Sequence, residues 1–127
     1  MEKILAERKE RPGTNLRKHV LLEQIAAYVD ANLTEKLTLK VISAQCGVSV
    51  STVTQLFQKK AATTFHDFLT QRRMEVAGKL IREGTPLEQV GKQVGYRDHS
   101  TFYRAFRRYF HLSPREYRMQ LLSEQDD

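Results

Sequence analysis

The chain has 127 residues, 40% of them hydrophobic, and a formal net charge of +6 at pH 7. This length suits one compact domain or two very small ones, and the single cysteine, Cys46, excludes an internal disulfide. No apolar run is long enough to span a membrane and the N-terminus lacks the apolar segment of a signal peptide, so we expect a soluble cytoplasmic protein without membrane contact.

The first 15 residues are mostly polar, with four basic and three acidic side chains. We predict a flexible basic arm over 1–15, with Thr14 or Asn15 as the N-cap of the helix that follows. Apolar residues then recur at three- and four-residue spacing, which predicts an amphipathic helix. These residues are Leu22, Ile25, Ala26, Val29 and Leu33.

A short helix, a glycine turn and another helix are predicted next. Thr38 is a candidate N-cap for the short helix, and Gly47 ends it because the chain must reverse through a positive φ angle. This helix is expected to bury Leu39, Ile42 and Cys46. Ser49 then caps a third helix. Its apolar face consists of Val53, Leu56 and Phe57.

A longer helix is predicted from Thr64, its candidate N-cap, to Gly84. The apolar residues that keep helical spacing along it are Phe65, Phe68, Leu69, Ala77, Leu80 and Ile81. Pro86 is acceptable in the first turn of the next helix, and Gly95 ends that helix. Its apolar stripe consists of Leu87, Val90 and Val94.

Two more helices complete the chain. Asp98 is the candidate N-cap of the first. We expect it to bury Phe102, Ala105, Phe106 and Tyr109, and Phe110 is expected to lie mostly in the core as well. Ser113 followed by Pro114 starts a last short helix, because serine caps well and proline is favoured at the first helical position. That helix carries Tyr117 and Leu121.

The helices predicted for 38–57 and 86–110 repeat one arrangement: a short helix, a turn glycine and a capped helix that carries phenylalanines. Two copies of this helix-turn-helix arrangement predict an all-α protein of about seven helices. The predicted domains are a first helix-turn-helix subdomain at 16–62, a linker helix at 63–84, a second subdomain at 85–122 and an acidic tail at 123–127.

The second helix of such a unit enters the major groove of DNA. In the second unit the face opposite the apolar stripe is polar and basic. It carries His99, Ser100, Tyr103, Arg104 and Arg107. Arg104 suits a bidentate contact to guanine, while Arg107 and Arg108 are placed to reach phosphates.

The corresponding helix of the first unit has no arginine. Its outward residues are Ser51, Thr54, Gln55 and Gln58. Gln55 suits adenine, and Lys59 and Lys60 at the helix end suit the DNA backbone. Solvated helix faces are the alternative interpretation, which the duplication and the arginines of the second unit make less favourable.

Residues 94–118, VGYRDHSTFYRAFRRYFHLSPREYR, resemble the signature of the AraC/XylS family of bacterial transcription regulators. The resemblance extends over about 18–118. It implies base contacts in the first unit at Ser51, Thr54 and Gln55. In the second unit it implies them at His99, Ser100, Tyr103 and Arg104 and, from the resemblance alone, at Thr101. Ala62 and His111 stand where the family usually has glycine, so local differences are expected at those helix ends. Gly91 replaces a usual alanine.

These features predict a transcription regulator that binds an asymmetric double-stranded DNA site as a monomer, in two successive major-groove segments about 34 Å apart. The resemblance implies an activator that contacts RNA polymerase, although repression by steric blocking is equally compatible. One alternative is a protein-interaction module that has lost DNA binding. Another is the DNA-binding part of a longer ligand-sensing regulator; Met1 slightly favours a complete small regulator.

No enzymatic site, cofactor or metal is expected. The four histidines share no ligand spacing, and a phosphate-binding glycine loop is missing from the sequence. Cys46 suits a small core residue better than a nucleophile.

Overall fold

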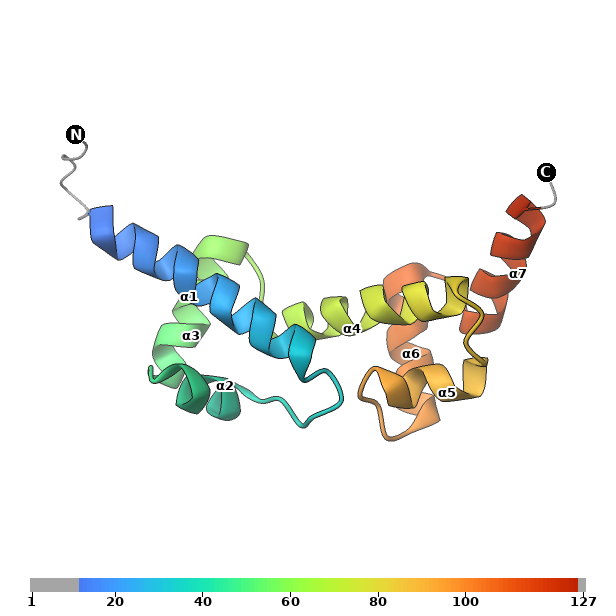
Figure 1. Ribbon diagram of the computed structural model, residues 1–127, viewed down its shortest axis with the longest axis horizontal. Helices are drawn as coiled ribbons and strands as arrows, with labels where there is room; N and C mark the ends of the chain where they lie inside the picture. Colours follow the sequence, from blue (N-terminus) through green and yellow to red (C-terminus); the bar gives the residue numbers. More distant parts are fainter. Residues whose placement is uncertain (1–11, 126–127) are drawn as a thin grey trace. The chain divides into compact units, whose positions relative to one another are not determined.

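The computed structural model describes residues 12–125, and every regular element in this range is helical. The elements are α1 (Pro12–Ala31), α2 (Leu39–Cys46), α3 (Val50–Leu56), the π-helical turn η1 (Phe57–Ala61), α4 (Phe65–Arg82), α5 (Leu87–Gln93), α6 (His99–Phe110) and α7 (Pro114–Gln125). The prediction of an all-α protein with about seven helices is confirmed (Figure 1).

The chain divides into two compact units. The first comprises the described residues up to Ala31 and Leu37–Phe65, and the second comprises Asn32–Lys36 and the described residues from His66 onward. Most of α4, predicted as a linker, therefore lies in the second unit.

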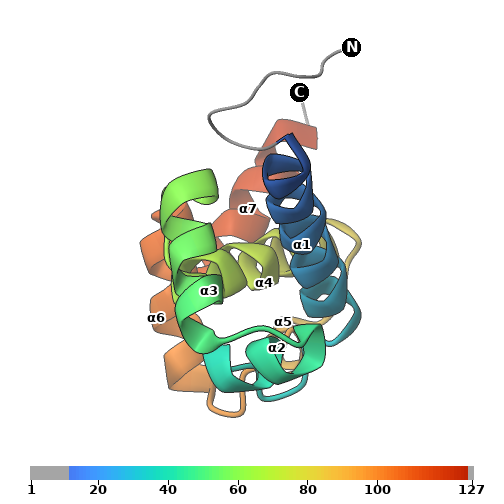
Figure 2. The same ribbon diagram turned by 90° about the vertical axis from the view of Figure 1, so that its left-hand side faces the viewer.

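α1, α2 and α3 surround the core of the first unit (Figure 2). The buried side chains are Ile25, Val29, Leu37, Ile42, Val53, Leu56, Phe57 and Phe65. The rings of Phe57 and Phe65 meet edge to face with centroids 5.7 Å apart. This geometry is favourable for aromatic pairs and joins η1 to the start of α4.

The second unit is built around one aromatic core. Its fully or nearly buried members are Met74, Ala77, Ile81, Val90, Val94, Phe102 and Phe106. A row of rings then runs from α6 to α7: Phe106 lies 4.4 Å from Phe110, and Phe110 lies 4.9 Å from Tyr117. Large buried aromatic side chains contribute most to a small core, so this row fixes α6 firmly.

Three of the helices begin where the sequence predicts, each with a backbone amide hydrogen-bonded to a capping side chain. Thr38 accepts from the Val41 amide at 3.2 Å, Ser49 from Thr52 at 3.0 Å, and Asp98 from Thr101 at 3.3 Å. These three N-cap predictions are confirmed, and so are the predicted turn glycines, Gly47 at φ 68° and Gly95 at φ 105°.

The turn at Gly95 requires glycine for two reasons. Its φ angle is unfavourable for other residues, and an added Cβ would overlap the Leu33 carbonyl oxygen and the Arg73 guanidinium. Arg73 donates to the Leu33 carbonyl from Nε at 3.1 Å and from Nη2 at 2.8 Å, and it stacks on the Tyr96 ring. Gly47, in contrast, has open space around it.

Several predictions about helix ends are wrong. Thr14 and Asn15 lie inside α1, which begins at Pro12, because proline fits the first position of a helix. Pro86 is the N-cap of α5 and not a residue of its first turn. The last helix, α7, has 12 residues and is not short. The predicted arm over 1–15 lies mostly outside the described residues.

Tyr109 is also misassigned as a core residue, because 38% of it is exposed. Phe110 takes the expected place, since it is the residue that packs on both Phe106 and Tyr117. The periodicity of α6 allows either residue to follow Phe106 on the buried face, and the position of α7 selects Phe110.

Ala62 and His111 adopt the left-handed conformation, with φ of 52° and 65°. The backbone at both helix ends therefore keeps the conformation that glycine would favour, and Ala62 follows the π-helical turn η1. The His111 amide donates to the Arg107 carbonyl at 2.7 Å. A left-handed non-glycine residue costs about 1–2 kcal/mol, which the surrounding packing must offset.

Candidate nucleic-acid interface

α6 has two opposite faces. Phe102 and Phe106 are completely buried in the second core. The other side exposes His99, Ser100, Tyr103, Arg104, Arg107 and Arg108. Because its hydrophobic face is held by the aromatic core, the polar face is presented on a rigid helix. Its hydroxyl, imidazole, phenol and guanidinium groups supply the donors and acceptors that groove reading requires.

The N-terminus of α6 is held by Asp98. The Thr101 hydroxyl donates to Asp98 Oδ2 at 2.9 Å. This hydrogen bond is the main cause that lowers the pKa of Asp98, with further help from the Ser100 and Thr101 amides and from the charge of Arg104. Thr101 is exposed, but its proton is committed to the cap. It therefore offers chiefly acceptor lone pairs to a partner.

A second carboxylate organises the C-terminal end of α6. Glu116 accepts from the Ser113 amide at 2.8 Å, and Ser113 Oγ accepts from the Glu116 amide at 3.0 Å. This reciprocal pair is a capping box, which the Ser-x-x-Glu spacing at 113–116 signals in the sequence. The Glu116 carboxylate also lies 3.6 Å from the Arg107 guanidinium, so the two form an ion pair.

The same Glu116 carboxylate has a lowered pKa, mainly because it accepts the Ser113 amide hydrogen bond, with a smaller effect from Arg107. Both carboxylates that organise α6 and α7 are therefore held in the ionised form.

The recognition helix of the first unit is shorter and uncharged. Ser51 and Gln55 are exposed, while Thr54 is half-buried. Gln55 Nε2 lies 3.4 Å from Ser51 Oγ, at the long end of hydrogen-bond distances, so the amide remains easy to redirect. Lys59 and Lys60 are exposed on η1, directly after α3.

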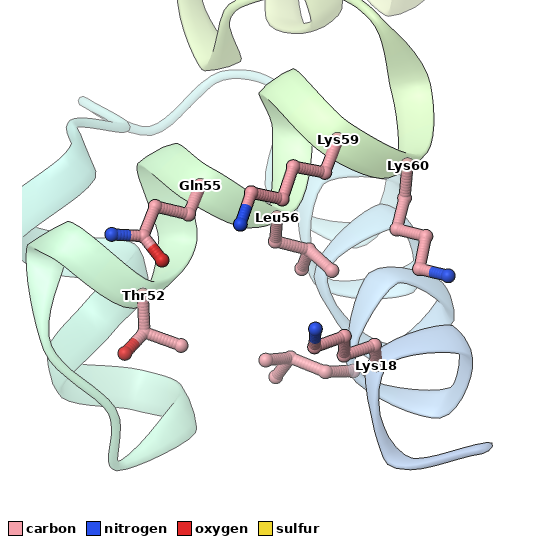
Figure 3. Close-up of a pocket in the computed structure, with 7 residues that line it drawn as sticks. Lys18, Thr52, Gln55, Leu56, Lys59 and Lys60 are labelled. Carbon is pink, nitrogen blue, oxygen red and sulfur yellow. The ribbon is translucent and has the colours of Figure 1, made fainter. Parts of the chain in front are cut away.

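A pocket of 240 Å³ lies between α1 and the α3–η1 segment of the first unit. Its lining consists of Lys18, Leu21, Thr52, Gln55, Leu56, Lys59 and Lys60. Figure 3 shows Leu56 between the Lys18 side chain on α1 and the Lys59 side chain on η1. Sequence reasoning missed Lys18, because nothing local relates α1 to residues some forty positions later.

Cys46 is half-buried, and burial raises the pKa of its thiol. A raised pKa reduces the thiolate fraction on which cysteine reactivity depends. Within residues 12–125, no group of three His, Cys, Asp or Glu side chains is placed to hold a metal ion. The helices of this range are also too short or too polar to cross a membrane.

Comparisons of the sequence with known proteins consistently give helix-turn-helix regulators. The family described as "Helix-turn-helix domain" matches residues 42–120. The regulatory protein SoxS of Escherichia coli K12 is 28% identical over 102 residues, which are 80% of this chain and 95% of SoxS.

Solved structures agree. The C-terminal domain of the two-component response regulator yesN from Fusobacterium nucleatum superposes with a TM-score of 0.70 and 30% identity, over 76% of this chain and 95% of that domain. A transcriptional regulator of Chromobacterium violaceum, described as having an AraC-type DNA-binding domain, gives a TM-score of 0.75 at 24% identity, over 83% of this chain and 95% of that one. This last likeness shows the fold.

Proposed function

Because the chain belongs to the AraC/XylS family of helix-turn-helix transcription regulators, we propose that it reads a specific double-stranded DNA site with both of its recognition helices, α3 and α6. The general activity, that of a DNA-binding transcription regulator, follows from the family. The proposal concerns how the residues of this chain divide the task.

The proposal is supported most directly by the two faces of α6, one buried and aromatic and the other exposed, polar and basic. Phe102 and Phe106 are fully buried, so the polar face has one fixed orientation on the second unit. In the proposed complex, base edges are contacted from α6 by His99, Ser100, Thr101, Tyr103 and Arg104. Arg104 supplies the most discriminating contact, because a guanidinium can pair with both acceptors of guanine.

α3 makes weaker base contacts through Ser51, Thr54 and Gln55, which are uncharged. Phosphate contacts come from Lys59 and Lys60 in the first unit and from Arg107 and Arg108 in the second, because these cations follow the polar faces toward the helix ends. Since the two faces differ in chemistry, a monomer should prefer an asymmetric site in which two successive major-groove segments carry different sequences.

Binding to DNA is tested by titrating labelled duplexes selected from a random pool, at several salt concentrations. If about five phosphates are contacted, the slope of log affinity against log salt should be about −4 to −5. Selected duplexes should bind more tightly than random ones. A slope near zero would instead favour a protein-interaction module with the same fold, which the uncharged α3 leaves as the second candidate.

The sign of regulation is a further part of the proposal: the protein activates transcription in the bacterial cytoplasm through contact with RNA polymerase. Transcription in vitro with purified polymerase, on a template that carries the selected site beside a promoter, measures this. Increased transcript supports activation, whereas decreased transcript that depends on overlap with the promoter identifies repression by blocking.

A further inference from the structure

The basic pocket of the first unit brings together cations that are distant in the sequence. Lys18 comes from α1, and Lys59 and Lys60 come from η1. Among the described residues that line the pocket there is no acid. Lysine side chains gathered around one hollow make an anion the expected occupant.

The apolar part of the lining explains how the lysines are held. Leu21, from α1, and Leu56, from α3, line the same pocket as the lysines, and Figure 3 shows Leu56 between Lys18 and Lys59. Lysine side chains lay their aliphatic stems along apolar surface and keep the ammonium group in water. The stems are thus partly ordered before binding, as the half-buried Lys18 indicates, so less conformational entropy is lost when an anion arrives.

The polar part of the lining indicates which anion is suitable. Thr52 and Gln55 contribute a hydroxyl and an amide beside the lysines, and Gln55 also belongs to the proposed base-reading face. The volume of 240 Å³ is below the range of about 300–1,000 Å³ usual for drug-sized ligands. A single tetrahedral oxyanion suits this volume and these hydrogen-bond donors better than an organic molecule does.

We propose that Lys18, Lys59 and Lys60 form one site for a backbone phosphate of DNA, namely a phosphate that flanks the base pair contacted by Gln55. This inference rests on the proposed function and extends it: α1 becomes a DNA-binding element. The first unit, which has no cation on its recognition helix, thereby obtains its positive charge from the two elements beside α3.

The test compares Lys18→Gln with Arg17→Gln. Arg17 is the exposed neighbour of Lys18 on α1 and does not line the pocket, so both variants lose one positive charge from nearly the same place. Lys18→Gln should weaken binding to selected and random duplexes alike, by a factor of about 5 if one charge-assisted contact is lost. It should also reduce the salt slope by about 1. Arg17→Gln should change both quantities much less.

The contact is located by replacing single phosphates of the selected duplex with neutral methylphosphonates. The wild-type protein should lose affinity at one phosphate beside the Gln55 half-site. Lys18→Gln should lose less than the wild type there, because the share of the contact made by Lys18 is already gone while Lys59 and Lys60 keep theirs. Arg17→Gln should show the full additional loss at that phosphate. Lys18→Met keeps the aliphatic stem, and circular dichroism checks folding of each variant.

The proposed phosphate site would be overturned if Lys18→Gln and Arg17→Gln reduced the affinity for DNA equally. It would also be overturned if the affinity losses from Lys18→Gln and from methylphosphonate replacement were strictly additive at every phosphate. Both results would leave DNA binding itself intact. If the wild-type protein itself bound no duplex, the proposed function would fail as well, so the two failures are distinguishable. Inorganic phosphate can be added to the binding assay, with chloride at the same ionic strength as the control. If phosphate weakens duplex binding by the wild-type protein more than by Lys18→Gln, the result supports the phosphate site.

Discussion

The two helix-turn-helix units share a framework but differ in what they display. Each has a short helix, a left-handed glycine and a capped recognition helix. α3 has seven residues and no charge, whereas α6 has 12 residues and carries Arg104, Arg107 and Arg108. A duplicated framework can thus keep its turn and caps while only one copy carries arginines on its recognition helix.

The units also differ in how firmly the turn and the recognition helix are held. Gly47 turns in open space, while Gly95 is enclosed by Leu33 and Arg73. α6 rests on a row of aromatic rings that continues to Tyr117, whereas α3 passes into a π-helical turn at Phe57. We therefore expect the second unit to be the more sensitive to changes at its turn.

The largest expected effect tests this difference directly. Gly95→Ala should destabilise the protein by about 2–4 kcal/mol, because a positive φ is unfavourable for alanine and the new Cβ would overlap buried neighbours. Gly47→Ala meets only the first cost, about 1–2 kcal/mol. Urea unfolding of both variants measures the two losses; equal losses would show that the crowding at Gly95 has no energetic consequence.

The next prediction concerns DNA discrimination. Arg104→Ala should weaken binding to the selected site by about 1–3 kcal/mol and flatten preference at one base pair. Arg108→Ala should weaken binding to all duplexes alike, and Gln55→Ala should have the smallest effect. Affinities for the selected site and for its single-base variants provide the measurement. A larger loss from Gln55→Ala than from Arg104→Ala would reverse the assignment of roles between the units.

A smaller effect on stability is expected at Ala62 and His111, the left-handed residues that follow the recognition segments of the two units. His111→Gly and Ala62→Gly should each stabilise the protein by about 0.5–1 kcal/mol, because glycine relieves the left-handed strain while its greater freedom in the unfolded chain offsets part of the gain. Thermal and urea unfolding should report similar values for the two variants. Destabilisation by either substitution would mean that the replaced side chain makes a contact worth more than the strain.

The smallest expected difference between the two units is in their stability at low pH. The N-caps of α2 and α3 are the hydroxyl groups of Thr38 and Ser49, which do not titrate in this range. Asp98 and Glu116, in the second unit, have pKa values lowered by the hydrogen bonds they accept. Their contribution to stability is therefore complete above the unfolded-state values, near 4, and is lost as the pH falls through the lower folded-state values.

Hydrogen exchange of individual amides at decreasing pH would follow this loss, and protection should fall first in the second unit. Asp98→Asn and Glu116→Gln are matched controls, since both keep the capping geometry without a titrating group. They should remove the difference in acid sensitivity. Earlier loss of protection in α2 and α3 would contradict the prediction.

Features that depend on neighbours along the chain could be predicted from the amino-acid sequence. The caps at Thr38, Ser49 and Asp98 and the turns at Gly47 and Gly95 occur where predicted, because each depends on hydrogen bonds or backbone angles within a few residues. Helical periodicity likewise identified the buried faces of α3 and α6. The capping box at Ser113 and Glu116 is local in the same sense, because the Ser-x-x-Glu spacing that forms it stands in the sequence.

Only the tertiary structure decided which of several locally equivalent possibilities is realised. Periodicity did not distinguish Tyr109 from Phe110, and the choice follows from the rings of α7. The hydrogen bonds from Arg73 to the Leu33 carbonyl join residues 40 positions apart, and Lys18 and Lys59, which are similarly distant in the sequence, line the same pocket. Such contacts depend on how helices pack, and packing energies between distant residues leave no periodic or local trace in the sequence.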